Sequence, residues 1–275
     1  MISLLGLVSI VLYLTATLLL GLRLTSSHYS GVGSRAGLLG TTMAAMFLHG
    51  ALLYQGVLTE GGLNLGFVNA ISLVAWAIVL FLLIVALGKP VENLGIFVLP
   101  LAALAVLLSL LYPSDRVRLE ETGFGVELHI VLSVIAASLL TIAAFQSILL
   151  AYQERHLRQK RPGRLLGSLP PMQTQESLLF QMIAIGFFLL SLSLVSGMMF
   201  LQDMFAQHLV HKTVLSLFAW LVFAVLLWGR WRYGWRGRTA IRWSLAGFFT
   251  LMLAYFGSKL VLELILNRSW YLPSG

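Results

Sequence analysis

Histidines are the side chains of this sequence with the widest choice of chemistry. The chain has 275 residues, including six histidines and no cysteine. An imidazole can bind a metal, carry a proton or hydrogen-bond a neighbour, whereas the lack of thiols excludes disulfides, thiol redox chemistry and thiolate metal sites. His129 is of first interest because it lies near the start of a long apolar stretch, residues 125–158. Ionisable groups inside membrane helices usually mark a functional site.

The elements that must position these histidines are membrane-spanning helices. Hydrophobic residues make up 59% of the chain and charged residues 10%, which is typical of a polytopic membrane protein. A span needs about 20 mostly apolar residues. Eight segments meet this requirement, namely 2–22, 36–57, 64–87, 92–112, 127–152, 177–201, 210–229 and 240–265. We expect one all-α membrane bundle over residues 1–275, since helices satisfy their own backbone in lipid.

Basic residues predict the orientation of this bundle. Lysine and arginine concentrate in every second connection and the segment ends beside it: Arg23, Arg35, Lys89, Arg155, Arg158, Lys160, Arg161, Arg164, Arg230, Arg232, Arg236, Arg238 and Arg242. The opposite side carries only Arg116, Arg118, Lys212 and Arg268. The positive-inside rule places the first group in the cytoplasm, so both termini are expected on the outer, periplasmic side. The net charge of +8 therefore does not call for a nucleic-acid partner.

In this orientation four histidines lie at one depth near the outer face. His129 opens the fifth span, and the seventh span begins at the same level. His49 lies fourteen residues past Arg35 in the second span, or about 21 Å along the helix axis at 1.5 Å per residue. The four are His49, His129, His208 and His211. The remaining two, His28 and His156, fall in cytoplasmic connections.

Small and polar residues predict that two of these histidines face other helices. One stripe at helical spacing consists of His129, Ser133, Ala137 and Thr141. A second consists of Thr42, Ala45, His49 and Gly56. Because stripes of this kind form packing faces in membrane helices, we expect the rings of His49 and His129 to point into the bundle.

Two interpretations of these histidines are open. Imidazoles from separate spans at one depth favour axial ligation of haem iron, and they suit zinc less well because cysteine is lacking and carboxylates are few. Alternatively, each histidine caps a helix or bonds a neighbouring carbonyl group. The second, structural interpretation is stronger for His208 and His211, because a histidine at the edge of a loop stays hydrated and so loses little free energy of solvation.

Two further features have competing explanations. Residues 226–243 alternate tryptophans and a tyrosine with arginines, which fits either a patch for an acidic ligand or an interfacial aromatic belt beside a cytoplasmic basic loop; we favour the belt. Lys259 and Glu263, four residues apart, give a weak indication of an ion or solute transporter. No nucleophile elbow, phosphate loop or HExxH motif occurs, so we expect no enzymatic activity.

Three stretches resemble the cytochrome c assembly family of the CcsA/CcmC type. The first is LHIVLSVIAASLLTIAAFQSILLAYQE at 128–154. The second is 169–200, with Gly186–Phe187 and Ser196–Gly197. The third is 211–259, with Trp220, Gly247–Phe248 and Tyr255–Gly257. The resemblance covers about residues 125–260. The segment FLHGALLYQ around His49 is similar to the small eight-span, HemX/YpjD-like branch.

This resemblance implies a role for His129 and also has two departures. His129 matches the family's outer haem histidine. The tryptophan-rich loop of haem-handling members is replaced here by LQDMFAQHLV at 201–210, and no histidine follows the last span. His49, His208 or His211 could therefore supply a second ligand. The resemblance implies a multi-pass protein of the bacterial inner membrane that binds haem b near the outer face through His129 with His49 or His211.

The resemblance also implies partners and an alternative function. Without cysteine, the chain would need partner proteins for any thiol step of cytochrome c maturation. The alternative is a non-catalytic regulator or scaffold of tetrapyrrole or cytochrome biogenesis, acting through its basic cytoplasmic loops. The altered loop favours this alternative, and the clustered histidines favour haem binding.

Overall fold

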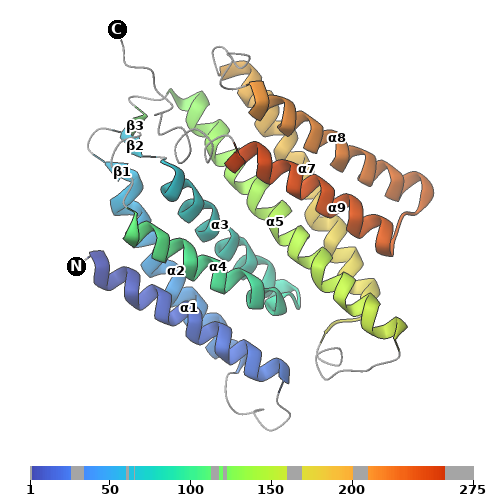
Figure 1. Cartoon of the computed structure of the whole chain (residues 1–275), viewed down its shortest axis with the longest axis horizontal. Coiled ribbons are helices and arrows are strands. Elements are labelled where there is room, and N and C mark those ends of the chain that lie inside the picture. The colour runs from blue at the N-terminus through green and yellow to red at the C-terminus, as the bar shows by residue number, and fades with distance from the viewer. Residues whose placement is uncertain are drawn as a thin grey trace.

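The fold is a bundle of long helices, seen in a computed structural model that describes residues 2–25, 34–59, 62–64, 66–112, 118–119, 123–159, 169–200 and 210–257 (Figure 1). The helices are α1 (Ile2–Thr25), α2 (Arg35–Val57), α3 (Phe67–Gly88), α4 (Gly95–Leu111), α5 (Phe124–Arg158), α7 (Met172–Phe200), α8 (Val210–Tyr233) and α9 (Gly237–Met252). Each arises from one of the eight apolar segments. The predicted all-α membrane bundle is confirmed.

Seven of these helices are long and apolar enough to cross a membrane. The remaining one, α9, has 16 residues and continues into a π-helical turn, η2 (Leu253–Gly257). The longest, α5, has 35 residues and is therefore about 50 Å long, against about 30 Å for the hydrocarbon core of a bilayer. It begins three residues earlier and ends six residues later than the expected span, so its ends extend beyond the hydrocarbon. Eight crossings and outward termini stay predictions.

The helices pack as two groups. In the first group α1 packs against α2 and α4, and α3 packs against α2 and α4. In the second group α5 packs along α7 and contacts α9, while α8 contacts α7 and α9. The groups meet where α3 contacts α5 (Figure 1). His49 belongs to the first group and His129 to the second.

A small antiparallel sheet, which the hydropathy pattern did not predict, lies at one end of the bundle. Its strands are β1 (Leu58–Thr59), β2 (Gly62–Asn64) and β3 (Arg118–Leu119), in the order β1-β2-β3. Leu63 pairs with Leu58 on one side and with Leu119 on the other. The sheet therefore joins the α2–α3 connection to the α4–α5 connection. Near it, the Asn69 amide donates to the carbonyl groups of Gly56 and Asn64, both at 3.2 Å.

Close packing between α5 and α7 depends on the glycine at position 186, which has no side chain. A Cβ atom at Gly186 would lie 2.8 Å from the side chain of Leu140, which is closer than real contacts permit. Small residues let membrane helices approach one another in this way. The α5–α7 pair is thereby held at the distance that brings polar side chains into contact at the end where α5 begins and α7 ends.

Candidate functional site

The site is built on the face of α5 that packs against α7. Gly125, His129 and Ser133 follow one another at four-residue spacing and therefore share this face. Ser133 is buried and His129 is partly buried. Opposite them, the last turns of α7 supply Ser193 and Ser196, which are both buried.

Hydrogen bonds determine how the His129 ring is used. Its Nδ1 atom lies 2.8 Å from the carbonyl oxygen of Ser193 and 3.2 Å from the Ser196 hydroxyl. A carbonyl oxygen can only accept, so Nδ1 carries the proton in this arrangement. The neutral ring then keeps its lone pair on Nε2, whose contact with the Ser133 hydroxyl is long, at 3.5 Å. This is the tautomer and support that metal-ligating histidines commonly have.

The two helices are also in close contact one turn before His129. A Cβ atom at Gly125 would lie 2.3 Å from the ring of Phe200 and 2.8 Å from its Cβ atom. Only glycine can occupy this position without displacing Phe200. The contact fixes the register of α5 against α7 and so places His129 opposite Ser193.

A second side of the site comes from α8 and the π-helical turn. The Lys212 ammonium in the first turn of α8 lies 5.6 Å from the centre of the Tyr255 ring. The Tyr255 side chain hydrogen-bonds Ser133, and the charge of Lys212 acts on His129. Isolated π-helical turns occur frequently at functional sites. Side chains of α7 and η2 thus bond to α5 here, and α8 packs beside α7 and η2.

The structure describes the backbone of His211 but not that of His208. His211 is the second residue of α8 and immediately precedes Lys212, although its side chain is not among those described. His208 lies outside the described residues, as do Lys259 and Glu263. The backbone therefore brings the start of α8 to the His129 site, and the predicted contributions of His208 and His211 stay predictions.

His49 occupies a different environment. Its side chain is completely buried (0% exposed). Nδ1 lies 3.3 Å from the Tyr13 hydroxyl on α1, and Nε2 lies 2.9 Å from the Ser72 hydroxyl on α3. The rings of Tyr13 and His49 meet edge to face, with their centres 5.9 Å apart. Both nitrogens are thus bonded to neighbouring helices of the first group, Nδ1 to α1 and Nε2 to α3.

The pairing of His129 with His49 stays a prediction, and the contacts show what it would require. Each ring is bonded within its own helix group, and among the residues that the structure describes no three potential metal ligands of the His, Cys, Asp or Glu type lie together. An axial pair formed by these two histidines would require His49 to give up a bond to Tyr13 or Ser72. The pairing with His211 requires no such loss at His49.

The sequence did not predict which residues would contact either ring. Ser196 stands out only as part of a family-like Ser-Gly pair, Ser133 only as part of the stripe on α5, and Ser193 not at all. Ser72 and Tyr13 carry no motif at all. Their roles depend on the helix register, which composition does not determine.

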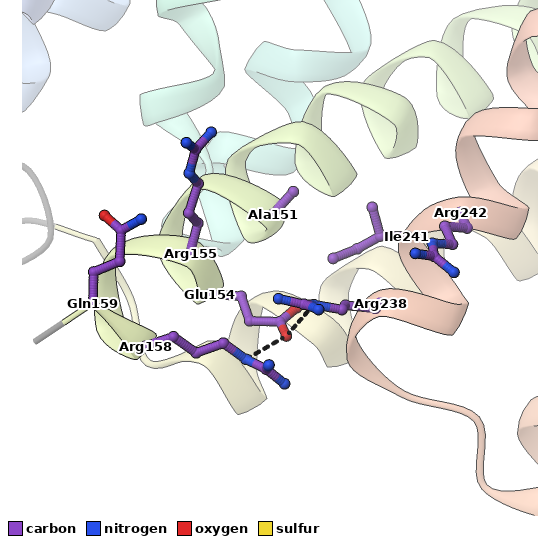
Figure 2. A pocket seen from close by; sticks show the side chains of 8 residues that line it. All are labelled: Ala151, Glu154, Arg155, Arg158, Gln159, Arg238, Ile241 and Arg242. Atoms are coloured by element: carbon purple, nitrogen blue, oxygen red, sulfur yellow. Dashed lines mark hydrogen bonds and ion pairs between the residues drawn. The ribbon is translucent and has the colours of Figure 1, made fainter.

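The opposite end of the second group is rich in arginine. Glu154 of α5 accepts from Arg158 at 3.2 Å and from Arg238 of α9 at 3.1 Å (Figure 2). Trp228, Trp231 and Tyr233 at the end of α8 are exposed, as expected of an interfacial belt.

Comparisons with known proteins identify relatives of this chain. Residues 38–266 match the family model described as Cytochrome C assembly protein. The chain is 34% identical over 231 residues to Inner membrane protein YpjD of Escherichia coli, covering 82% of this chain and 86% of that protein. It is 36% identical over 157 residues to an uncharacterized 28.8 kDa protein of Azospirillum brasilense, covering 56% and 58% of the two chains.

A shorter region is similar to a protein with a stated role. Over 100 residues the chain is 27% identical to Cytochrome c biogenesis protein CcsA of Picosynechococcus, which covers 36% of this chain and 30% of that protein. No solved structure matches the chain.

Proposed function

Because the chain belongs to the cytochrome c assembly protein family, we propose that it binds haem b near the outer face of the bacterial inner membrane, with His129 as an axial ligand. The observation that carries this proposal is the hydrogen bond from His129 Nδ1 to the Ser193 carbonyl oxygen, at 2.8 Å. It directs the lone pair of the neutral ring to Nε2 and holds the ring in one orientation. The inner-membrane location is supported by the similarity to Inner membrane protein YpjD of Escherichia coli.

The residues around His129 fit a large, flat, apolar ligand. Phe124 and Leu128 near the start of α5 and Phe200 at the end of α7 are exposed hydrophobic side chains at the same end of this helix pair. Lys212 supplies a positive charge at the same end of the bundle, which suits the carboxylate groups that a porphyrin carries. Bound haem would supply an iron centre; the chain's own part is to bind and orient it, and we assign no bond-making step to its side chains.

We choose His211 as the second ligand. It lies next to Lys212, whose charge acts on His129, whereas both nitrogens of His49 already have partners. His208 is three residues before His211 and is the next choice. Partner proteins of cytochrome c maturation would receive the haem, and any thiol chemistry would belong to them because the chain has no cysteine.

A haem titration tests this proposal. The purified full-length protein in detergent, titrated with haemin, should develop a Soret band at one haem per chain. The His129→Ala variant should lose the band, and added imidazole should restore part of it. His156→Ala is the matched control, since His156 lies on the same helix and also bonds a carbonyl oxygen through Nδ1, that of Tyr152 at 3.0 Å.

The outcomes are distinguishable. Loss of the band in His129→Ala and His211→Ala, with the control and His49→Ala unchanged, supports the proposed pair. Loss in His129→Ala and His49→Ala overturns the choice of His211. Lack of stoichiometric haem binding by the unmutated protein overturns the function itself and returns the chain to the regulator or scaffold alternative.

A further inference from the structure

A pocket with a volume of about 490 Å³ lies at the other end of the second helix group, where α5 ends. It forms where the last turns of α5 meet the first turns of α9 (Figure 2). Its walls include four arginines and a single carboxylate: Arg155, Arg158, Arg238, Arg242 and Glu154. We call this site the arginine pocket. The proposed haem site does not use any of these residues.

The charge of the arginine pocket is only partly balanced within the chain. Glu154 is mostly buried, with 14% of its side chain exposed, and it pairs with Arg158 and Arg238. Arg155 and Arg242 form no ion pair with any residue that the structure describes. Figure 2 shows both guanidinium groups apart from the Glu154 carboxylate. Four like charges around one cavity repel one another, so the arrangement favours a bound anion.

The chemistry of the walls favours a phosphate group. Arginine presents a planar fork of N–H donors that matches the oxygens of a phosphate group. It is therefore preferred over lysine at sites that recognise phosphate through two parallel hydrogen bonds. The lining contains no lysine and no histidine. Below the charged rim, Ala151 and the buried side chain of Ile241 provide an apolar wall.

The surroundings of the pocket place it at the level of the membrane surface. The neighbouring end of α8 carries Trp228 and Trp231, exposed by 52% and 82%, and α9 begins only four residues after α8 ends. Exposed aromatic rings of this kind mark the headgroup region of a bilayer. A ligand with a phosphate group and hydrocarbon chains would meet both the arginines and the apolar wall. A soluble phosphate would use only the arginines.

We propose that the arginine pocket binds the phosphate headgroup of an anionic phospholipid, with Arg155 and Arg242 as the groups that contact the headgroup directly. Basic pockets between membrane helices are known to bind such headgroups. Arg158 and Arg238 contribute through Glu154, which holds the end of α5 against the start of α9. The bound lipid would supply the negative charge that the chain lacks at this contact. This proposal is independent of haem binding.

Lipid retention tests the proposal. The full-length protein is reconstituted in nanodiscs containing phosphatidylglycerol and phosphatidylcholine, and the lipids kept after release into detergent are counted by native mass spectrometry. The unmutated protein should retain one phosphatidylglycerol. The double variant Arg155→Gln/Arg242→Gln should retain it more weakly, by about fivefold for each arginine removed.

A matched variant separates the pocket from general surface charge. Arg23→Gln/Arg232→Gln removes the same charge from two exposed arginines at the ends of α1 and α8, outside the pocket, and should retain the lipid as the unmutated protein does. Equal loss in both double variants overturns the proposal. Arg242→Lys, which keeps the charge and the fold but loses the fork, should give an intermediate result.

Inorganic phosphate distinguishes the source of the ligand. Added at millimolar concentration during release, it should leave the retained phosphatidylglycerol in place. If inorganic phosphate displaces the lipid, the pocket is a site for soluble phosphate compounds and the lipid assignment is overturned. If the pocket variant retains lipid as well as the unmutated protein does, the assignment is also overturned.

Discussion

The environments of His49 and His129 differ in ways that indicate different roles for the same side chain. His49 is completely buried and both of its nitrogens are bonded to hydroxyl groups, one on α1 and one on α3. His129 is only partly buried; its Nδ1 is held by a backbone carbonyl group, and its Nε2 has one long contact. The first arrangement uses the whole ring to connect helices. The second arrangement holds Nδ1 in a hydrogen bond and leaves Nε2 available to a ligand.

This comparison shows why depth in the membrane is a weak guide to function. A ring that already makes two good hydrogen bonds loses one of them when it binds a metal, and a buried partner is then left unsatisfied, which costs about 1–3 kcal/mol. His129 would lose only the 3.5 Å contact with Ser133. The two histidines at similar predicted depth therefore differ in the cost of ligation.

The largest expected effect is on haem affinity at His129. His129→Ala should weaken haemin binding by about a hundredfold or more, because an axial ligand contributes more than the supporting groups whose loss costs about 10–100-fold. Its thermal unfolding in detergent should change little, since the ring is partly exposed. A large loss of stability without a change in the haemin titration would reverse the roles assigned to the two histidines.

The opposite result is expected at His49. His49→Ala should lower the free energy of unfolding by about 2 kcal/mol, because the Tyr13 and Ser72 hydroxyls would be left buried without their partner. Haemin binding by the folded fraction should stay unchanged. Unfolding in a denaturing detergent measures the first effect, and the Soret titration measures the second. Unchanged stability would show that His49 is not a connecting residue.

A smaller effect is expected where α5 and α7 touch. Gly125→Ala should destabilise the protein by about 1–2 kcal/mol, since the added methyl group overlaps the Phe200 ring. It should also weaken haemin binding by shifting His129 relative to Ser193. The double variant Gly125→Ala/Phe200→Ala removes the overlap and should recover part of both losses. Additive losses in the double variant would contradict a direct contact between these residues.

The smallest effect is expected from the second partner of Nδ1. Ser196→Ala removes the 3.2 Å contact but leaves the Ser193 carbonyl oxygen as acceptor. Haemin affinity should therefore fall by only about threefold, which corresponds to the loss of one weak hydrogen bond. Ser191→Ala, at a residue of α7 that instead accepts from Trp220, serves as the control. A loss as large as that of His129→Ala would mean that Ser196, and not the backbone, orients the ring.

The helices could be predicted from the sequence because each one is an apolar run long enough to cross a bilayer. The end of α5 was underestimated, since its last turns are polar and are supported by the Glu154–Arg158 pair that hydropathy ignores. The three-stranded sheet was missed because β3 pairs with a strand more than fifty residues earlier, through segments of two or three residues.

The candidate site could be predicted only in part. His129 stood out because it is an ionisable residue at the start of an apolar helix. The partner that fixes its tautomer is a backbone carbonyl group at Ser193, and a backbone atom leaves no mark in the sequence. The partners of His49 lie 36 residues before it and 23 residues after it, so they depend on how α1, α2 and α3 align.

The length and continuity of α5 have one mechanical consequence. His129 and Glu154 lie 25 residues apart on this helix, or about 37 Å along its axis. From Val126 to Arg158 the helix contains neither glycine nor proline, the residues at which sharp bends usually occur. It is therefore a stiff rod that runs from one membrane surface to the other, and any tilt imposed at one surface must displace the groups it carries at the opposite surface.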